Sequence, residues 1–192
     1  MAVLALGSST VTTRAQGVTI SDPGLNAAIR EALQRLTGPL TQPDLLSLTL
    51  LSACCRDIQG IEGFEAARNL TILDLHGNSL TNFEVPGSLT NLQILDLLAN
   101  QLRSFVLPTT LPRLRIVDLG FNSLGQCLLP NGLTHFHTRF LQNNQLPSFT
   151  LPAGLSRLTQ LDLSDNQLAV LSVPAEMKNI STLLGFANQL AS

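Results

Sequence analysis

The chain has 192 residues, a net charge of −2 at pH 7 and only 12% charged residues. It contains no run of basic residues, so a nucleic-acid partner is not expected, because proteins that bind nucleic acids carry a basic patch or stripe. No stretch reaches the about 18 to 20 apolar residues of a membrane-spanning helix, so no membrane span is expected. Trp and Tyr are absent, so a binding surface would depend on Phe, Ile, Asp and Arg.

Residues 1–18 have features of an export signal. The segment MAVLALG is apolar, and TTRAQG resembles the small-residue region at a signal-peptide cleavage site. The positively charged segment that opens such signals is absent, and the apolar run is short. We therefore expect residues 1–18 to be a signal-peptide remnant or a disordered leader, which favours an extracellular or cell-surface location.

Residues 19–47 are predicted to form a helical N-terminal cap. Ser21 or Asp22 can cap a first helix, with Pro23 at its first position. Apolar residues then recur at helical spacing as far as Gly38, which would end the helix: Leu25, Ile29, Leu33 and Leu36. A second short helix is expected to begin at Thr41. Such a cap covers the apolar edge of a repeat array, and solenoids require one for solubility.

Residues 48–192 consist of seven 22-residue repeats, of which the last is incomplete. Asparagine recurs every 22 residues without insertion or deletion, at Asn78, Asn100, Asn122, Asn144, Asn166 and Asn188. Around these asparagines the chain follows the pattern L-x-x-L-x-L-x-x-N-x-L, and Arg56 replaces asparagine in a degenerate first repeat. A fixed period of this kind indicates one supersecondary unit repeated in tandem.

This pattern is typical of leucine-rich repeats and predicts a leucine-rich-repeat solenoid, a right-handed curved horseshoe built mostly of β-structure. Alternate residues of a strand face opposite sides, so the leucines of each repeat bury against the next repeat beneath a parallel β-sheet on the concave face. Proline recurs in the second half of five repeats, at Pro86, Pro108, Pro130, Pro152 and Pro174. Because proline disfavours helix interiors, we expect extended segments or short strands on the convex side. We interpret the asparagines as a structural ladder whose amides pair with backbone groups of adjacent coils.

The cysteines suggest neither a disulfide framework nor a zinc site. Cys54 and Cys55 are neighbours, whereas Cys127 lies three repeats, or about 15 Å, further along the stack. His76 beside Asp74 is interpreted as surface filling. No phosphate-binding glycine loop, G-x-S-x-G elbow or H-E-x-x-H helix is present, so we expect no enzymatic activity, no metal and no cofactor.

Two segments, SDPGLNAAIREAL…GPLTQPDLLSL and LTLLSACCRDIQGIEGFEAARNLTILDLHGNSL, resemble the opening of bacterial internalin-like leucine-rich-repeat proteins. The resemblance covers residues 20–190 and implies a secreted or surface-exposed scaffold that binds other proteins and has no enzymatic activity in its repeats. No receptor-binding motif of a particular internalin is matched. The return segments also resemble the L-P-x-x-L-x-x-L repeats of some bacterial ubiquitin ligases, so the alternative is the substrate-binding region of a larger enzyme.

The concave sheet is the predicted binding surface because it is broad, rigid and repetitive. The candidate ligand-binding residues are Ile72, Asp74, His76, Ile94, Asp96, Leu98, Ile116, Asp118 and Phe140. The aspartates of this face would repel one another at about 5 Å, so a protein ligand with a basic feature would relieve the repulsion. Calcium fits this row less well because it prefers about six to eight oxygens on flexible loops. The alternative is that L-D-L is only the common filling of the repeat, with aspartate chosen for solubility.

Arg139 and Phe140 depart from the repeat pattern, because the arginine falls at a buried leucine position and the phenylalanine at a solvent position. Burying an unpaired guanidinium is costly. We therefore predict a local register shift or bulge that turns Phe140 inward and Arg139 outward. His135 and His137 lie nearby but lack a third ligand, so no metal site is expected there.

The sequence stops just after the strand half of the seventh repeat. Ile180, Leu183 and Leu190 would then have no covering segment at this edge. We expect either a fragment of a longer protein or a structural module that self-associates end to end through this edge.

Overall fold

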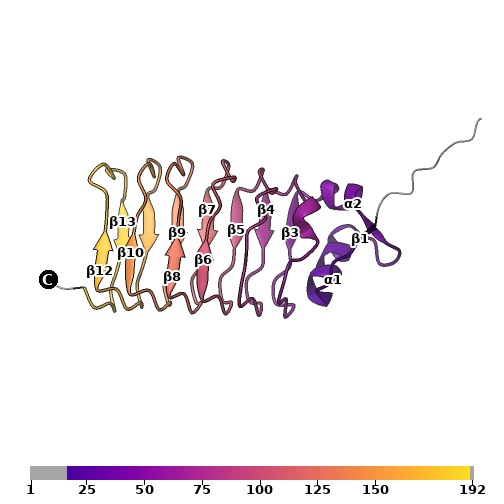
Figure 1. Ribbon diagram of the computed structural model, residues 1–192, viewed down its shortest axis with the longest axis horizontal. Helices are drawn as coiled ribbons and strands as arrows, with labels where there is room; N and C mark the ends of the chain where they lie inside the picture. The colour runs from indigo at the N-terminus through magenta and orange to yellow at the C-terminus, as the bar shows by residue number, and fades with distance from the viewer. Residues whose placement is uncertain (1–16, 191–192) are drawn as a thin grey trace, which may run out of the picture.

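The computed structural model describes residues 17–190, and of Thr138 and Arg139 it describes the backbone alone. The chain winds as a solenoid whose rungs stack in a single row away from a helical cap (Figure 1). One strand from each repeat joins a seven-stranded parallel sheet in the order β13-β11-β9-β7-β5-β4-β3. The strands are β3 (Leu50–Ser52), β4 (Ile72–Asp74), β5 (Ile94–Asp96), β7 (Ile116–Asp118), β9 (Thr138–Phe140), β11 (Gln160–Asp162) and β13 (Thr182–Leu184). The predicted leucine-rich-repeat solenoid is confirmed, and we call the outer surface of this sheet the sheet face.

The opposite, return side of the solenoid carries short strands and extended segments, as predicted. Strand β6 (Ser104–Val106) pairs in parallel with β8 (Gln126–Leu128), and β10 (Ser148–Thr150) pairs with β12 (Val170–Ser172). In each of these four repeats a proline follows two residues after the strand and keeps the backbone out of the helical region. The first repeat has no such proline, and its return segment forms the 3₁₀ helix η1 (Phe64–Ala66) instead.

Helix α1 (Pro23–Ala32) opens the cap. The Asp22 carboxylate accepts a hydrogen bond from the backbone N–H of Leu25 at 2.9 Å, so Asp22 is the N-cap residue. The helix ends earlier than predicted. Gln34 adopts the left-handed conformation at φ 52°, and the N–H of Arg35 returns to the carbonyl of Arg30, which makes a Schellman turn. Leu36 therefore lies outside the helix and is 81% exposed, so its assignment to the buried helical stripe was wrong.

The second helix, α2 (Gln42–Ser47), begins as predicted at a capping residue, Thr41. The Thr41 hydroxyl and the Asp44 carboxylate bond reciprocally to each other's backbone N–H groups, which forms a capping box. Just before α2, strand β2 (Leu40–Thr41) pairs antiparallel with β1 (Gly17–Val18). The cap thus includes Gly17 and Val18, two residues before the expected start at residue 19, and residues 1–16 of the leader expected over residues 1–18 lie outside the described part of the chain.

The hydrophobic core is one continuous band that runs from the cap into the later repeats. The middle position of each sheet strand holds leucine or valine except in β9, where it holds Arg139, and Leu51, Leu73 and Leu95 are fully buried. Leu25, Ile29 and Leu45 of the cap are also fully buried, and α1 packs against β3. At the far end of the stack Leu183 occupies the same column as Leu73 but is 44% exposed. Burial in this fold therefore depends on having a neighbouring rung on both sides.

Strand β9 shows no register shift. Its residues pair with β7 and β11 in the same register as every other rung, so Phe140 aligns with Asp118 on one side and Asp162 on the other. The predicted shift was wrong because a slip would break ladder hydrogen bonds to both neighbouring strands at once. Phe140 lies half-buried on the sheet face. The predicted outward turn of the Arg139 side chain lies outside what the structure describes.

Candidate functional site

The sheet face brings together three isoleucines and three aspartates on the adjacent strands β4, β5 and β7. Ile72, Ile94 and Ile116 are direct register partners, and so are Asp74, Asp96 and Asp118. All six side chains are half-buried. Phe140 continues the aspartate row on β9, whereas His76 and Leu98 follow the ends of β4 and β5 and are half-buried. The nine candidate residues therefore form one contiguous surface, with its centre at β5.

Each aspartate of this row has a structural role that was not predicted. The Oδ1 atom accepts a hydrogen bond from the backbone N–H two residues later, at the point where the strand ends. These bonds join Asp74 to His76, Asp96 to Leu98, Asp118 to Gly120 and Asp162 to Ser164, at 3.1, 3.0, 3.0 and 2.9 Å respectively. Aspartate at this position therefore shapes the turn after each strand, which explains its recurrence beyond any effect on solubility.

The carboxylates of this row differ in their environments. Burial, with a smaller contribution from the nearby charge of Asp96, raises the pKa of Asp118 to about 6, although the hydrogen bond from the Gly120 N–H acts in the opposite direction. Asp74 instead has partners for both oxygens, because Ser52 donates to Oδ2 at 3.0 Å and His76 Nδ1 lies 2.7 Å from Oδ1. Among the described residues, no lysine or arginine forms an ion pair with Asp96 or Asp118. These two carboxylates are the part of the row that remains available to a cation.

The asparagine column lies in the turns below the sheet and binds the rungs to one another. In the first complete turn, Asn78 Oδ1 accepts the backbone N–H groups of Arg56 and Ile58, both at 3.0 Å. Its Nδ2 donates to the carbonyls of Ala53 at 2.9 Å and Leu75 at 2.8 Å. In each of the other five asparagines, Oδ1 accepts one backbone N–H from the preceding repeat, and Nδ2 donates to carbonyls of its own and the preceding repeat: Asn100, Asn122, Asn144, Asn166 and Asn188. Both hydrogens of every Nδ2 are used in these backbone bonds, which supports a structural role for the column.

In every repeat, the residue immediately before the asparagine, or before Arg56 in the first repeat, adopts the left-handed backbone conformation. This second column comprises Cys55, Gly77, Ala99, Phe121, Asn143, Asp165 and Ala187, with φ between 53° and 64°. Glycine and asparagine tolerate this region, but alanine, phenylalanine and cysteine are strained in it. Gly77 and Asn143 gave a sequence signal for the conformation, and the other five positions could have been found from them by the 22-residue period.

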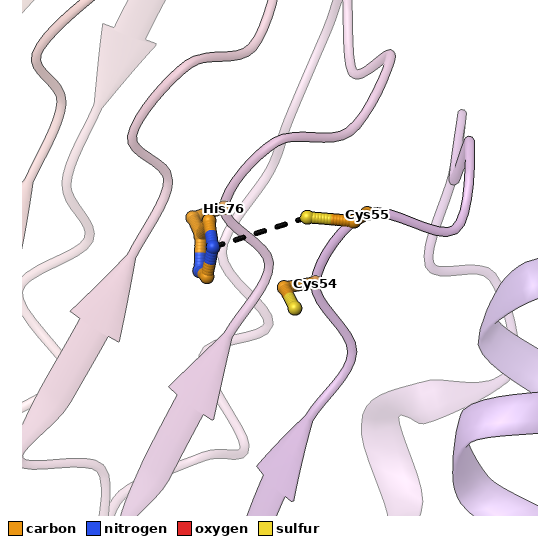
Figure 2. A group of neighbouring side chains, drawn as sticks. All are labelled: Cys54, Cys55 and His76. Atoms are coloured by element: carbon orange, nitrogen blue, oxygen red, sulfur yellow. Dashed lines mark hydrogen bonds between the residues drawn. The ribbon is translucent and has the colours of Figure 1, made fainter.

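The same turns bring together Cys54, Cys55 and His76, a group that the sequence analysis missed. Figure 2 shows Cys54 and Cys55 on the turn after β3 and His76 on the turn after β4, with the Cys54 sulfur turned away from the other two. Cys55 Sγ is directed at the imidazole and lies 4.0 Å from His76 Nε2. The ligand atoms of the three residues all lie within 4.8 Å of one another. Cys54 and His76 are one period apart, so they occupy the same column on adjacent rungs, and this spacing was the signal that could have revealed the group.

Several contacts hold this group in place. His76 Nδ1 lies 2.7 Å from Asp74 Oδ1, so the carboxylate fixes one ring nitrogen. The other ring nitrogen, Nε2, faces Cys55 (Figure 2). The hydrogen bond between the two thiols and partial burial raise the pKa of Cys54. A side chain at Gly77 would crowd the group, because a Cβ there would lie 3.1 Å from Cys55 Sγ.

Comparisons with known proteins identify the repeat. The family description "Leucine Rich repeats (2 copies)" matches residues 68–109, and "Leucine Rich Repeat" matches residues 157–180. Among curated proteins, none matches the sequence. None of the helices in residues 17–190 has the length and apolar character that a membrane span requires.

Solved structures of bacterial proteins share this architecture. Internalin C2 of Listeria monocytogenes is 26% identical, with a TM-score of 0.74 over 90% of this chain and 77% of that one. Internalin F of the same organism is 22% identical, with a TM-score of 0.63 over 90% of this chain and 58% of its own. The leucine-rich effector protein YopM of Yersinia pestis is 23% identical, with a TM-score of 0.55 over 64% of this chain and 33% of its own, so it and internalin F support the fold alone. Taken with the 22-residue period and the seven-stranded sheet, these matches show that the chain is an internalin-like leucine-rich-repeat protein with the fold of a protein-interaction repeat domain.

Proposed function

We propose that this chain is a non-enzymatic, exported scaffold that recognises a protein ligand with a basic feature through the sheet face. The observation that carries the proposal is the pair Asp96 and Asp118, two carboxylates on neighbouring strands that have no cationic partner among the described residues. Each uses Oδ1 to hold its turn, so the second oxygen is left for a lysine or arginine of the ligand.

The surroundings of this pair favour a protein ligand over a free ion. Ile94 and Ile116 lie beside the carboxylates on the same face, and Phe140 lies next to Asp118 in register. When a ligand covers these half-buried apolar side chains, they would exclude water from an ion pair made at the carboxylates and so strengthen it. Export is proposed from the resemblance to internalins described above.

The test uses the described carboxylates while preserving their structural bonds. Asp96→Asn and Asp118→Asn keep an Oδ1 acceptor for the backbone N–H groups of Leu98 and Gly120, so the turns should survive. A matched control, Glu65→Gln with Glu84→Gln, removes two exposed carboxylates that lie outside the sheet face. All three proteins would be probed with a random-peptide display library selected on the parent chain.

We expect the selected peptides to be enriched in lysine and arginine, and to bind the Asp96/Asp118 double variant at least about tenfold more weakly than the parent or the control. Binding should also weaken as salt is raised, because part of the attraction is electrostatic. Peptides that bind the parent and the double variant equally well would refute the role of the aspartate pair.

A further inference from the structure

We propose that Cys54, Cys55 and His76 form a binding site for a thiophilic divalent cation of the Zn²⁺ type, with Asp74 as the outer residue that orients the histidine. The ligand atoms of the three residues lie within 4.8 Å of one another at the turns after β3 and β4. Cys55 Sγ already faces the imidazole, and rotation of the Cys54 side chain would bring its sulfur to the same point (Figure 2). This inference is independent of the proposed protein-binding function, because it uses neither Asp96 nor Asp118.

The spacing of the three groups is close to that of a tetrahedral site. Bond lengths of about 2.3 Å to sulfur and about 2.0 Å to nitrogen place two sulfurs about 3.8 Å apart and a sulfur and a nitrogen about 3.6 Å apart. Cys55 Sγ and His76 Nε2 are 4.0 Å apart, and all three ligand atoms lie within 4.8 Å of one another. Side-chain rotations that move the sulfurs by about 1 Å would therefore complete the ligand geometry.

The histidine is already oriented as a metal ligand. A carboxylate can only accept hydrogen bonds, so Asp74 Oδ1, 2.7 Å from His76 Nδ1, selects the form of the ring that carries hydrogen on Nδ1. In the neutral ring, Nε2 then has its lone pair free on the side of Cys55. This carboxylate–histidine arrangement is the usual outer support of a zinc-bound imidazole.

The backbone of the two rungs holds the ligands in place before any ion binds. Cys55 N donates to the carbonyl of His76 at 3.1 Å, and Ala53 N donates to that of Asp74 at 2.8 Å. Gly77 is the one glycine in the left-handed column of the described repeats, and it lies where a Cβ would press on Cys55 Sγ. A rigid frame of this kind reduces the entropy lost when the cation is bound.

The types of donor atom determine which class of cation the site would prefer. Two sulfurs and one imidazole nitrogen suit Zn²⁺ and related thiophilic ions, whereas Ca²⁺ and Mg²⁺ prefer oxygen ligands. Cys55 is exposed and the His76 side chain is 36% exposed, so an ion can reach the site and a fourth position stays open to water. A second set of donors, Asp74, His76 and Asp96, shares the same histidine and would compete with the sulfur site.

The test is titration of the reduced, purified full chain with Co²⁺ and then Zn²⁺. We expect one equivalent of Co²⁺ to produce a sulfur-to-cobalt charge-transfer band together with the visible bands of a tetrahedral ion, and Zn²⁺ to displace it. Cys54→Ser, Cys55→Ser and His76→Gln should each lose the charge-transfer band or weaken Zn²⁺ binding, as measured by competition with a chromophoric chelator. Asp74→Asn should weaken Zn²⁺ binding about 10- to 100-fold, the usual effect of removing an outer-shell partner.

Two controls make the result decisive. Cys127→Ala changes a cysteine in β8, three repeats away and on the return side, and should leave the Co²⁺ spectrum unchanged. Asp96→Asn should also leave it unchanged if the sulfur set is the site. Loss of binding in Asp96→Asn with retention in both cysteine variants would overturn the assignment in favour of the carboxylate set. Absence of any charge-transfer band with the fully reduced protein, verified by thiol counting, would overturn the proposal altogether.

Discussion

The interior columns and the face columns of the same seven-stranded sheet follow different rules. Along the interior, Leu73, Leu95 and Val117 are almost completely buried, and the asparagine below them repeats the same set of backbone bonds from rung to rung. Along the face, the columns one position away keep isoleucine and aspartate on β4, β5 and β7 but change to other residue types on β3, β9 and β13. Two polar atoms on this side, Gln142 Oε1 and Ser164 Oγ, are buried without a hydrogen-bond partner among the described residues.

The difference shows which positions of the repeat determine the fold and which are free to serve a function. An interior residue must fit the rungs on both sides, so packing and backbone pairing dictate it and it reveals the fold. A face residue contacts a neighbour and solvent, so several residue types are tolerated and its identity reflects other demands. Features of the sheet face that differ between rungs, such as the raised pKa of Asp118, are therefore more informative about function than the interior columns are.

The largest effect should come from breaking the interior column. Asn100→Ala leaves the carbonyls of Leu75 and Leu97 and the N–H of Leu80 without their side-chain partner in a buried turn. We expect a loss of about 2–3 kcal/mol in the free energy of unfolding, measured by urea denaturation. Asn91→Ala is the matched control, because Asn91 donates to the carbonyl of Arg68 and accepts from Arg113 at exposed sites, and its loss should cost less than about 0.5 kcal/mol. Equal losses in the two variants would contradict the special contribution of the buried asparagine bonds.

A smaller effect, dependent on pH, should come from the face. Because Asp118 has a folded-state pKa of about 6 against an ordinary value of 3.8, the folded chain holds the proton more tightly than the unfolded chain between these values. Stability therefore falls as pH rises from about 4 to about 6, and the full penalty is present above pH 6.

Asp118→Asn removes this penalty while keeping the bond to Gly120. Allowing for the partial exposure of the carboxylate, the variant should be more stable than the parent by about 1 kcal/mol at pH 7.5 and equal to it below about pH 4. Thermal melts at both pH values check this, with Asp162→Asn as a variant that makes the same change two strands away. A gain that is independent of pH would show that ionisation is not its cause.

The smallest effect should come from the left-handed column between the interior and the face. Ala99 is exposed and has a φ of 53°, so Ala99→Gly relieves backbone strain, which outweighs the greater freedom of glycine in the unfolded chain. We expect a gain of about 0.5 kcal/mol in urea denaturation. The same substitution at Ala27, an exposed position within α1, should have the opposite sign and cost about 1 kcal/mol. A loss at both positions would mean that the turn at Ala99 is not strained.

Most of the fold could be predicted because the same residue pattern recurs in successive repeats and specifies the same backbone each time. The 22-residue period, the leucine spacing and the prolines together imply one strand per rung and an extended return side. The end of α1 could not be predicted in this way, since Gln34 forms a Schellman turn without the glycine that normally signals one. Nor could the register of β9, because the local cost of Arg139 was weighed without the ladder bonds to two neighbouring strands.

The candidate site was harder to predict because it depends on neighbours in space. The placement of the isoleucine and aspartate columns followed from strand alternation, but the strand-ending bond of each aspartate did not. Cys54 and His76 lie one 22-residue period apart, yet the sequence analysis treated the cysteines and the histidine separately. Equivalent positions of adjacent repeats lie side by side in the stack, and this rule places Cys54 next to His76.

The asparagine bonds also determine how the molecule would respond to tension. Asn78 joins groups of its own turn to groups that lie 20 to 25 residues earlier, and the later asparagines do the same, so each turn is closed only by the rung that follows it. A force that pulls the chain away from its last rung would therefore break the asparagine hydrogen bonds of one rung at a time. Each 22-residue rung occupies about 5 Å of the stack but about 75 Å when extended, so every rung that detaches would lengthen the chain by about 70 Å.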